Sequence, residues 1–365
     1  MKIAITSPRA PVVVEWIKIM QKSGHDVTVV DSLIFPVAKF SKNVKFIKIP
    51  SPRLNFEEYK NKILLITKEY DLVIPTCEDI FFLSLALKNS ELVSKVFIPE
   101  NKLLFGLHNK FTFKDYMNHH VKVPEMKLIE SVNQIDTHNK NTILKPVFSR
   151  FGRSVVRDIT HKNIGNLVVS KQYPWVQQEF IKGNPLCNYA IIQNGKVISH
   201  VVYIPKYLVN NAASTYFEFT TNKKCDDFIE QFAKDTKYNG QVAFDFIDDG
   251  KNLYVLECNP RATSGLHLIS ESISFENGNF ISDHKNPHQS CRVSISIYIM
   301  FGVKYLLSGK ISELNRDYKK AFDVAKDIPI KAQVLSLIEM IWRTFYYRMP
   351  FTSASTFDIE YDGTF

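Results

Sequence analysis

The residues best suited to chemistry lie within residues 240–261, where apolar and polar side chains alternate on both sides of the polar run 248–252. This alternation around turn-forming residues predicts a β-hairpin. Successive side chains of a strand point to opposite faces, so one face of the second strand collects every other residue. That face is expected to carry Leu253, Val255, Glu257 and Asn259.

A second carboxylate is expected to face this strand from the first one. With the loop centred on Gly250, Asp245 lies opposite Val255 and diagonal to Glu257 on the same face. Mg²⁺ prefers oxygen ligands, usually carboxylates together with nucleotide phosphates. Arg261 follows the strand, and its planar fork of donors suits a phosphate. The pattern indicates a site for a hard cation and a phosphate, although an ordinary hairpin with two solvated acids has the same spacing.

The run Leu-Glu-Cys-Asn-Pro-Arg at 256–261, after a strand that carries an Asp, resembles the metal-binding signature of the ATP-grasp superfamily. In that superfamily the acidic residues and the Asn bind Mg²⁺, and the Arg meets the transferred phosphate. The resemblance implies that Asp245, Glu257 and Asn259 bind Mg²⁺, with Mn²⁺ as a substitute. It also implies a catalytic role for Arg261.

Two lysines upstream resemble the phosphate-binding positions of the same superfamily. Lys110 is expected to open a helix that ends before Pro124, and Lys145 belongs to a strand over residues 142–147. The resemblance implies that both bind the nucleotide phosphates and that Lys145 also takes part in catalysis. Either lysine alone has the simpler interpretation of a surface residue, but the order of the motifs along the chain favours the superfamily.

The loop 148–155 is similar to the flap that covers the phosphates in the carbamoyl-phosphate synthetase branch of the superfamily. That flap is rich in glycine, whereas this loop keeps only Gly152 and adds Arg150 and Arg153. The departure predicts that side chains as well as main-chain amides contact the phosphates. Ser149 and Arg153 are the candidates for binding the nucleotide.

Residues 175–183 resemble the hinge that holds adenine in ATP-grasp enzymes. Main-chain groups make these contacts in the family, which implies that the Glu179 carbonyl accepts from the adenine amino group and the Ile181 N–H donates to the ring. The implied nucleotide-binding residues of the hinge are Gln178, Glu179, Phe180 and Ile181. The family often has an acidic residue for the ribose after the hinge, where this chain offers Asn184 and Asn188.

The N-terminal part of the chain alternates apolar runs with helical periodicity. The expected order is strand 2–6, helix 11–23, strand 26–31, helix 56–68 and strand 71–75. This βαβ order predicts a parallel, Rossmann-like layer, and ATP-grasp proteins commonly carry such a layer before the ATP-grasp domain. A nicotinamide oxidoreductase is the rival hypothesis, but the first turn, residues 7–11, lacks the glycines of a dinucleotide fingerprint.

Four further residues are candidates for binding a substrate. Arg9 and Glu78 follow strands of the Rossmann-like layer at their carboxyl ends, where open α/β sheets bind ligands. Arg9 suits a carboxylate and Glu78 an amine. Ser264 and His267 follow the signature arginine, and His267 could act as an acid or base. Capping, surface or purely structural roles are the simpler alternatives.

The C-terminal residues are expected to form a mainly helical segment. Helical periodicity covers 293–307 and 331–348, and the alternation of 355–361 is typical of an edge strand. The apolar side chains of the second helix fall on one broad face, which favours packing against the body of the protein. Its arginines leave a helix lying at a membrane surface as the alternative.

Composition fits a globular protein. The chain has 365 residues, is 45% hydrophobic and has a formal net charge of +9, which favours anionic ligands such as nucleotides. No motif typical of nucleic-acid binding occurs, so a nucleic acid is not expected as a partner. Five scattered cysteines without a CxxC pair indicate a reducing cytoplasm. Neither a signal peptide nor a transmembrane segment is expected, because the longest apolar run, 293–303, is too short for a bilayer.

Sequence and resemblance together predict an α/β (α+β) chain with an ATP-grasp fold. The expected parts are a Rossmann-like pre-ATP-grasp domain (1–104), an ATP-grasp domain (105–290) with a nucleotide-binding lid (about 110–183) and a metal-binding core (about 184–290), and a helical segment (291–365). The resemblance implies an ADP-forming carboxylate–amine ligase of small molecules, and dimers are common among relatives. The alternatives are a bicarbonate-using carboxylase or carbamoyl-phosphate-type enzyme, and an ATP-binding module without activity.

Overall fold

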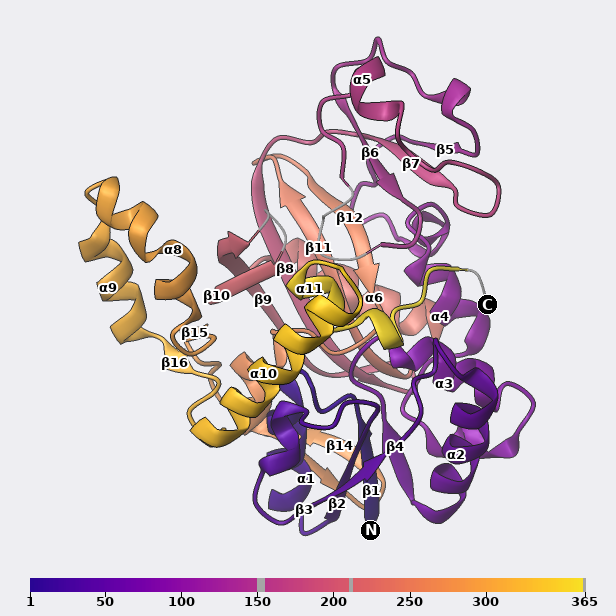
Figure 1. The fold of residues 1–365 in the computed structure, drawn as a ribbon, viewed down its shortest axis with the longest axis vertical. Helices are drawn as coiled ribbons and strands as arrows, with labels where there is room; N and C mark the ends of the chain where they lie inside the picture. The colour runs from indigo at the N-terminus through magenta and orange to yellow at the C-terminus, as the bar shows by residue number, and fades with distance from the viewer. Residues whose placement is uncertain (150–154, 210–212, 364–365) are drawn as a thin grey trace.

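The computed structural model of the chain describes residues 1–149, 155–209 and 213–363 (Figure 1). Within these residues the strands form a sheet of four, a sheet of three, a sheet of seven and a two-stranded ribbon. Helices cover the sheets, so the predicted mixed α/β class is confirmed.

The N-terminal layer is a parallel sheet in the order β3-β2-β1-β4. Its strands are β1 (Lys2–Thr6), β2 (Asp26–Asp31), β3 (Val44–Lys48) and β4 (Leu72–Ile74). Its helices are α1 (Val12–Lys22), η1 (Val37–Phe40), α2 (Phe56–Glu69), α3 (Asp79–Leu87) and η2 (Glu91–Lys95). The Rossmann-like layer is thereby confirmed. The sequence patterns do not predict β3, because this short edge strand mixes two lysines with three apolar residues and buries none of its side chains completely.

The expectation that Lys110 opens a helix is wrong. Helix α4 (Asn101–His108) ends before it, and only a 3-10 helix, η3 (Thr112–Tyr116), follows. The break has a local cause at Asn109, whose side-chain oxygen accepts from the main-chain N–H groups of Phe111 at 2.8 Å and Thr112 at 3.1 Å. Such a turn competes with helical hydrogen bonding.

A small antiparallel sheet in the order β5-β7-β6 forms the upper part of the molecule in Figure 1. Its elements are β5 (Met126–Ile129), η4 (Val132–Gln134), β6 (Thr142–Pro146), α5 (His161–Ile164) and β7 (Trp175–Glu179). It has a core of its own, built around Ile129, Leu144 and Trp175. We call this part the lid sheet.

Below the lid sheet lies a seven-stranded sheet in the order β12-β11-β8-β9-β10-β15-β16 (Figure 1). Its strands are β8 (Asn184–Gln193), β9 (Lys196–Val209), β10 (Ala213–Thr220), β11 (Gly240–Asp248), β12 (Leu253–Asn259), β15 (Ser290–Arg292) and β16 (Phe322–Asp323). Helix α6 (Lys223–Thr236) packs on it through Phe228 and Phe232, whose rings lie 4.9 and 5.1 Å from the ring of Phe244. The predicted hairpin of β11 and β12 is therefore confirmed at one edge of this sheet.

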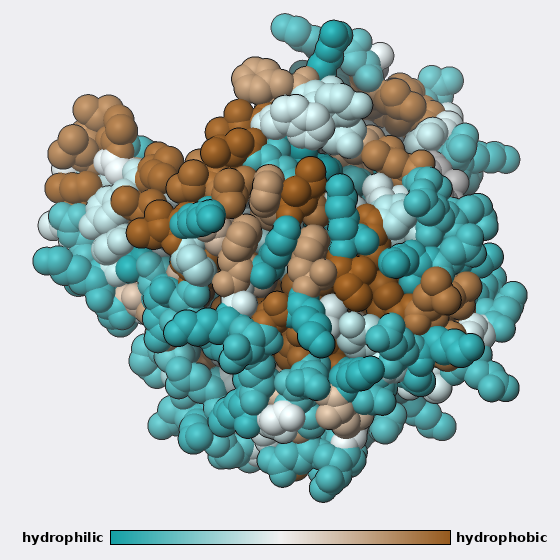
Figure 2. Space-filling view, turned by 60° about the horizontal axis from the view of Figure 1, so that its bottom comes forward, coloured by the Kyte–Doolittle hydropathy of each residue, from teal (hydrophilic) through white to brown (hydrophobic). Residues whose placement is uncertain are grey.

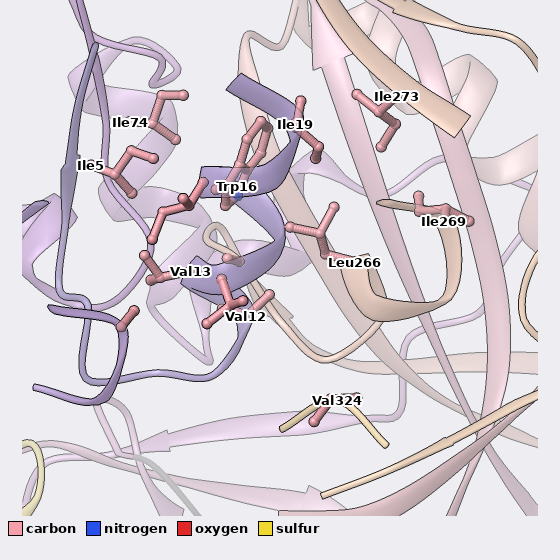
Figure 3. Packing of buried hydrophobic residues seen from close by; sticks show 14 of the residues in the cluster. Ile5, Val12, Val13, Trp16, Ile19, Ile74, Leu266, Ile269, Ile273 and Val324 are labelled. Atoms are coloured by element: carbon pink, nitrogen blue, oxygen red, sulfur yellow. The ribbon is translucent and has the colours of Figure 1, made fainter. Parts of the chain in front are cut away.

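A shared core joins the N-terminal layer to the segment after β12. That segment contains α7 (Leu266–Ile269), η5 (Ser270–Ser272), β13 (Ile273–Glu276) and β14 (Asn279–Ser282). Figure 3 shows α1 between the two parts, with Trp16 and its neighbours packed against side chains of both. The indole N–H of Trp16 also donates to the side chain of Gln241 on β11 at 2.8 Å. Helix α1 thus fixes the N-terminal layer relative to the hairpin.

The C-terminal elements are α8 (Ser296–Leu307), α9 (Ile311–Lys320), α10 (Ile330–Tyr346), α11 (Phe351–Ala354) and η6 (Phe357–Ile359). Helices α8 and α9 project as a lobe, and α10 crosses the front of the molecule (Figure 1). The expected edge strand at 355–361 is wrong, because η6 and a loop occupy these residues. Asp358 and Tyr361 in this segment are both buried against the N-terminal layer.

Most apolar side chains of α10 do not pack against the body, contrary to expectation. The buried residues of the helix are Ala332, Glu339, Met340 and Arg343. The broad apolar face predicted for 331–348 is exposed instead. None of the described helices combines the length with the apolar content that crossing a lipid bilayer would require.

Candidate active site

A β-bulge sets the geometry of the hairpin. Asp245 pairs directly with Glu257, whereas the next residue, Phe246, pairs with Val255. Leu256 is therefore an extra residue on β12. The predicted position of Asp245 opposite Val255 is wrong, and the bulge brings the two carboxylates closer together in register than the regular hairpin would.

The bulge also changes which residues of β12 share a face. Leu253 and Val255 lie in the buried core with Cys258, so these three side chains share one side of the strand. Glu257 lies on the other side, opposite Asp245, and Asn259 follows it. The expectation that Glu257 and Asn259 share a face with Leu253 and Val255 is therefore wrong.

Polar contacts connect the signature residues to one another. Asn259 Nδ2 lies 3.5 Å from Asp245 Oδ2, and Arg261 Nη2 donates to Asn259 Oδ1 at 3.0 Å. Arg261 Nε lies 3.8 Å from the carboxylate of Glu78, which is buried at the end of the N-terminal layer. Glu78 thus belongs to the same cluster as the signature, although it comes from a separate part of the sequence.

Two buried lysines approach this cluster from the lid side. Lys110 Nζ donates to the carbonyl of Ser149 at 2.8 Å and lies 3.3 Å from Glu257 Oε2. Lys145 Nζ donates to the carbonyl of Leu256 at 3.0 Å. The structure therefore brings both lysines to the bulged segment of β12, Lys110 from the turn after α4 and Lys145 from β6.

The cluster shifts the protonation of its members. Burial and the neighbouring Glu257 both raise the pKa of Asp245, since two carboxylates in one buried place cannot both ionise freely. Burial alone would also raise the pKa of Glu257, but Lys110 and Lys145 lower it instead. Burial lowers the pKa of Lys145 to about 8, although Glu257 opposes the shift. Perturbed groups of this kind concentrate at functional sites.

The donor set suits a magnesium ion. No group of three or more His, Cys, Asp or Glu side chains able to hold a metal occurs among the described residues. The candidates are instead two carboxylates and one amide, and Mg²⁺ typically takes one or two carboxylates plus phosphate oxygens. A bound cation would also relieve the repulsion that raises the pKa of Asp245. Asp245, Glu257 and Asn259 therefore fit the ion.

The hinge candidates lie at the end of β7 in the lid sheet and in the link from β7 to β8. Gln178 is buried in β7, and its Oε1 has no hydrogen-bond partner among the described residues. The N–H of Phe180 donates to the carbonyl of Asn141 at 2.8 Å, and Glu179 and Ile181 are half-buried. A Cβ at Gly183 would lie 2.3 Å from the carbonyl oxygen of Asp248, so the hinge passes very close to the hairpin.

The ribose candidates differ in their surroundings. Asn188 is fully buried in the central sheet, where Nδ2 lies 3.1 Å from His200 and Oδ1 accepts from the N–H of Phe244 at 2.7 Å. Both polar atoms of its side chain are thus engaged with residues of the central sheet. Asn184 is exposed at the start of β8.

The flap candidates are only partly described. Ser149 lies at its start, where its Oγ donates to the carbonyl of Pro146 at 3.4 Å and its own carbonyl accepts from Lys110. Arg153, like Arg150, lies outside the described residues.

Arg9 lies away from the carboxylate cluster, in an ion-pair network. Its guanidinium contacts Asp31 and Asp358, and it also donates to the hydroxyl of Ser32 and the carbonyl of Ser355. These bonds engage all five donors of the arginine. These contacts are those of a residue that holds the fold together.

The two candidates after Arg261 also differ. Ser264 is half-buried in the turn before α7, and its carbonyl accepts from the N–H of His267 at 3.1 Å. His267 is buried against α1, with Nδ1 3.1 Å from the carboxylate of Glu15. The structure thus pairs His267 with Glu15 and places Ser264 nearer the signature.

Two residues near the cluster belong to none of the sequence motifs. Cys187 on β8 pairs in register with Asp245. His108 ends α4, two residues before Lys110, and burial lowers its pKa to about 4, so the ring is neutral near pH 7. No local pattern points to either residue, because each reaches the cluster through tertiary packing.

A comparison with protein families finds one match in this part of the chain. A family model described as an ATP-grasp domain matches residues 107–265. The chain contains an ATP-grasp domain. The matched range includes both lysines, the hinge, the hairpin and the signature arginine. A comparison with curated proteins found no significant match.

Solved structures of similar fold include one ligase and two synthetases. An L-amino acid ligase from Bacillus licheniformis has 16% sequence identity and a TM-score of 0.57, over 74% of this chain and 70% of the ligase. An N5-carboxyaminoimidazole ribonucleotide synthetase, solved as an ADP complex, has 13% identity and a TM-score of 0.62, over 84% of each chain. The Staphylococcus aureus N5-carboxyaminoimidazole synthetase with ADP has 15% identity and a TM-score of 0.58, over 75% and 74%. At such identities the likeness shows the fold alone.

Proposed function

We propose that the protein is an ATP-dependent carboxylate–amine ligase that forms an acyl phosphate and then an amide bond. The observation that carries the proposal is the opposed carboxylate pair, Asp245 and Glu257, with the Lys110 amine 3.3 Å from Glu257. A paired acid site bordered by buried lysines suits a cation together with the phosphates of a nucleotide. The ligases of similar fold support this reaction class.

Different residues of the site have different roles in phosphoryl transfer in this proposal. Asp245, Glu257 and Asn259 would hold Mg²⁺, or Mn²⁺ in its place, and the bound ion would supply positive charge to offset the charge that develops on the phosphates of ATP. Lys110 and Lys145 bind the phosphates from the lid side. The hinge residues 178–181 hold the adenine.

Arg261 belongs beside the transferred phosphoryl group in this proposal. Its bond to Asn259 Oδ1 at 3.0 Å keeps the guanidinium at the metal-binding edge. Glu78, 3.8 Å from Arg261 Nε, orients the guanidinium from behind. A planar guanidinium in a fixed orientation suits a phosphoryl group better than a flexible ammonium does.

The reaction balances in two steps. A carboxylate oxygen of the first substrate attacks the γ-phosphorus of ATP, the bond to the bridging oxygen breaks, and ADP leaves. The nitrogen of a neutral amine then attacks the acyl carbon, phosphate departs, and the surplus amine proton passes to solvent. Neither step oxidises or reduces a substrate.

The test is ADP release from Mg·ATP with pooled carboxylates (amino acids, hydroxy acids and fatty acids) and pooled amines, added separately and together. We expect ADP only when both pools are present. Glu257→Gln should lower this rate at least about 100-fold, because it removes one metal-binding charge. The matched control is Asp249→Asn in the exposed hairpin loop, which keeps the side-chain oxygen that accepts from Lys251 and Asn252.

Two other results would count against the ligase, and a third against its metal-binding residues. ADP released with bicarbonate and without a carboxylate pool would favour a carboxylase. A rise in melting temperature with Mg·ATP but no ADP under any condition would favour an ATP-binding module without activity. Full activity of Glu257→Gln would overturn the assignment of the metal-binding residues.

A further inference from the structure

Helices α8 and α10 expose apolar side chains that an amphipathic helix normally buries. In α10, Ile330 is 80% exposed, Phe345 77% and Trp342 56%; in α8, Leu307 is 83% exposed and Ile299 73%. The remaining exposed apolar residues of the two helices are Met300, Val303, Leu306, Val334, Leu337, Ile338, Ile341 and Tyr346. Together these thirteen residues form what we call the apolar face.

The hydrophobic surface can be followed in Figure 2. Brown residues gather on the lobe of α8 and α9 and continue across the middle of the same side of the molecule. A soluble monomer rarely exposes so large a group of apolar side chains unless something binds there. The apolar face therefore requires an occupant.

Polar contacts hold α10 in this inverted orientation. The buried carboxylate of Glu339 accepts from the N–H groups of Ile34 at 2.8 Å and Phe35 at 2.7 Å. The buried guanidinium of Arg343 contacts Asp358 and donates to the carbonyl of Ala354 at 2.9 Å. The bonds of Glu339 and Arg343 hold one side of α10 against the body. The apolar side chains on the other side of the helix therefore point outward.

The exposed charges within the two sequence ranges that carry the apolar face are of one sign. In residues 295–310 and 329–351, the exposed charged side chains are Lys304, Lys310, Lys331 and Arg348. These two ranges contain one acidic residue, Glu339, and it is buried. The nearest exposed acid in sequence, Asp327, is paired with Lys18 at 2.8 Å.

We propose that the apolar face of α8 and α10 docks on the surface of an anionic lipid bilayer. Apolar and aromatic side chains bordered by lysine and arginine are the pattern of helices that lie in a membrane interface. The basic side chains would meet lipid phosphates while their aliphatic stems cover apolar surface. The indole of Trp342, stacked on Tyr346 at 4.8 Å, suits the headgroup region, where such rings concentrate.

Charge separates this occupant from a second copy of the chain. A symmetric dimer through the apolar face would place its basic side chains against the same side chains of the other copy. No exposed acid lies within the two ranges to compensate that repulsion. An anionic lipid surface provides the missing negative charge, so the observations favour lipid over self-association.

The tryptophans of the chain make the test direct. The sequence has three, and Trp16 is 0% exposed, Trp175 7% and Trp342 56%. A change in tryptophan emission on docking therefore reports on Trp342. Full-length protein is titrated with vesicles of phosphatidylcholine alone or mixed with phosphatidylglycerol, and binding is checked by flotation. We expect a blue shift and flotation with the anionic vesicles only, both weakened by added salt.

Two variants and two matched controls identify the surface. Leu307→Ser with Phe345→Ser should weaken binding to the anionic vesicles at least about tenfold, because each removes apolar area that lipid would bury. Leu65→Ser, a 64% exposed leucine on α2, should leave binding unchanged. Lys304→Gln with Lys331→Gln should weaken binding, whereas Lys62→Gln with Lys68→Gln on α2 should not. The melting temperature of each variant verifies folding.

Three results would overturn the proposal. The first is the absence of any blue shift or flotation with anionic vesicles. The second is equal binding to neutral and anionic vesicles, which would remove the role of charge. The third is a concentration-dependent dimer without lipid that Phe345→Ser dissociates, since it would assign the apolar face to a second copy. None of these outcomes depends on the proposed ligase activity.

Discussion

The side-chain amine of Lys145 donates a 3.0 Å hydrogen bond to the carbonyl of Leu256, the extra residue in the bulge of β12. That bulge places Glu257 opposite Asp245. A phosphate-binding candidate on the lid sheet therefore holds the backbone segment that orients the carboxylate pair. This bond and the approach of Lys110 to Glu257 at 3.3 Å both connect the lid side of the candidate site to β12.

Replacing Lys145 should impair nucleotide binding more than stability. Lys145→Met keeps the length of the side chain but loses its charge and its donor. We expect the KM for ATP in the ADP-release assay to rise at least about tenfold, because a charge-assisted contact is lost. The free energy of unfolding should change by no more than about 2 kcal/mol, since removing a buried charge offsets the lost hydrogen bond. Lys127→Met, an exposed lysine on β5 of the lid sheet, is the control.

Asp245→Asn should abolish activity but raise the stability of the metal-free protein. Burial and Glu257 raise the pKa of Asp245, so the metal-free protein holds two opposed acids at a cost. The amide removes that repulsion, and we expect a higher melting temperature in EDTA together with loss of ADP formation. The increase in melting temperature caused by Mg·ATP should disappear as well. Asp227→Asn on the exposed side of α6 serves as the control, and a lower melting temperature for Asp245→Asn would contradict the argument.

Gly183 should tolerate no side chain. A Cβ there would lie 2.3 Å from the carbonyl oxygen of Asp248, which is backbone and cannot move aside cheaply. We expect Gly183→Ala to lower the free energy of unfolding by about 1–3 kcal/mol and to raise the KM for ATP, because the hinge is displaced. Gly302→Ala is the matched control, since its nearest neighbour would be 4.0 Å away within α8. Alanine there should be neutral or stabilise the helix by up to about 1 kcal/mol.

Asp358 should govern part of the acid sensitivity of the fold. Burial alone would raise the pKa of Asp358, yet the guanidinium groups of Arg9 and Arg343 lower it to about 2. A lowered pKa in the folded state gives stability that is present above the unfolded pKa, near 4, and is lost as the pH falls through the folded value. Urea unfolding between pH 5 and pH 2 should therefore show a loss on the order of 2 kcal/mol from this residue.

The variant Asp358→Asn tests that assignment. It should be less stable than the parent protein at pH 7, because two buried guanidinium groups lose their shared carboxylate. Its stability should also fall less steeply between pH 4 and pH 2. An unchanged slope over that range would mean that other carboxylates govern the acid transition.

Local patterns predicted the hairpin and the order of motifs, but not the register at the centre of the site. Alternation alone placed Asp245 opposite Val255, whereas Glu257 occupies that position. The bulge that makes the difference is held by Lys145, 111 residues away in sequence from Leu256. A period-2 pattern contains no information on such a contact.

Two other differences between prediction and structure also arise from partners that are distant in sequence. Arg9 follows β1 where ligands often bind, but Asp358, 349 residues away, neutralises it. Helix α10 has the amphipathic pattern of a packed helix, and its orientation is set by Glu339 and Arg343, which the pattern counts as its solvent side. Single polar residues with buried partners outweigh the apolar periodicity in this helix.

The bond between Arg9 and Asp358 has a consequence for how the chain folds. The two residues lie 349 residues apart in sequence. Until the segment that carries Asp358 docks, the N-terminal layer holds a buried guanidinium that lacks one of its two ion-pair partners. Folding of this layer is therefore completed only when that distant segment arrives.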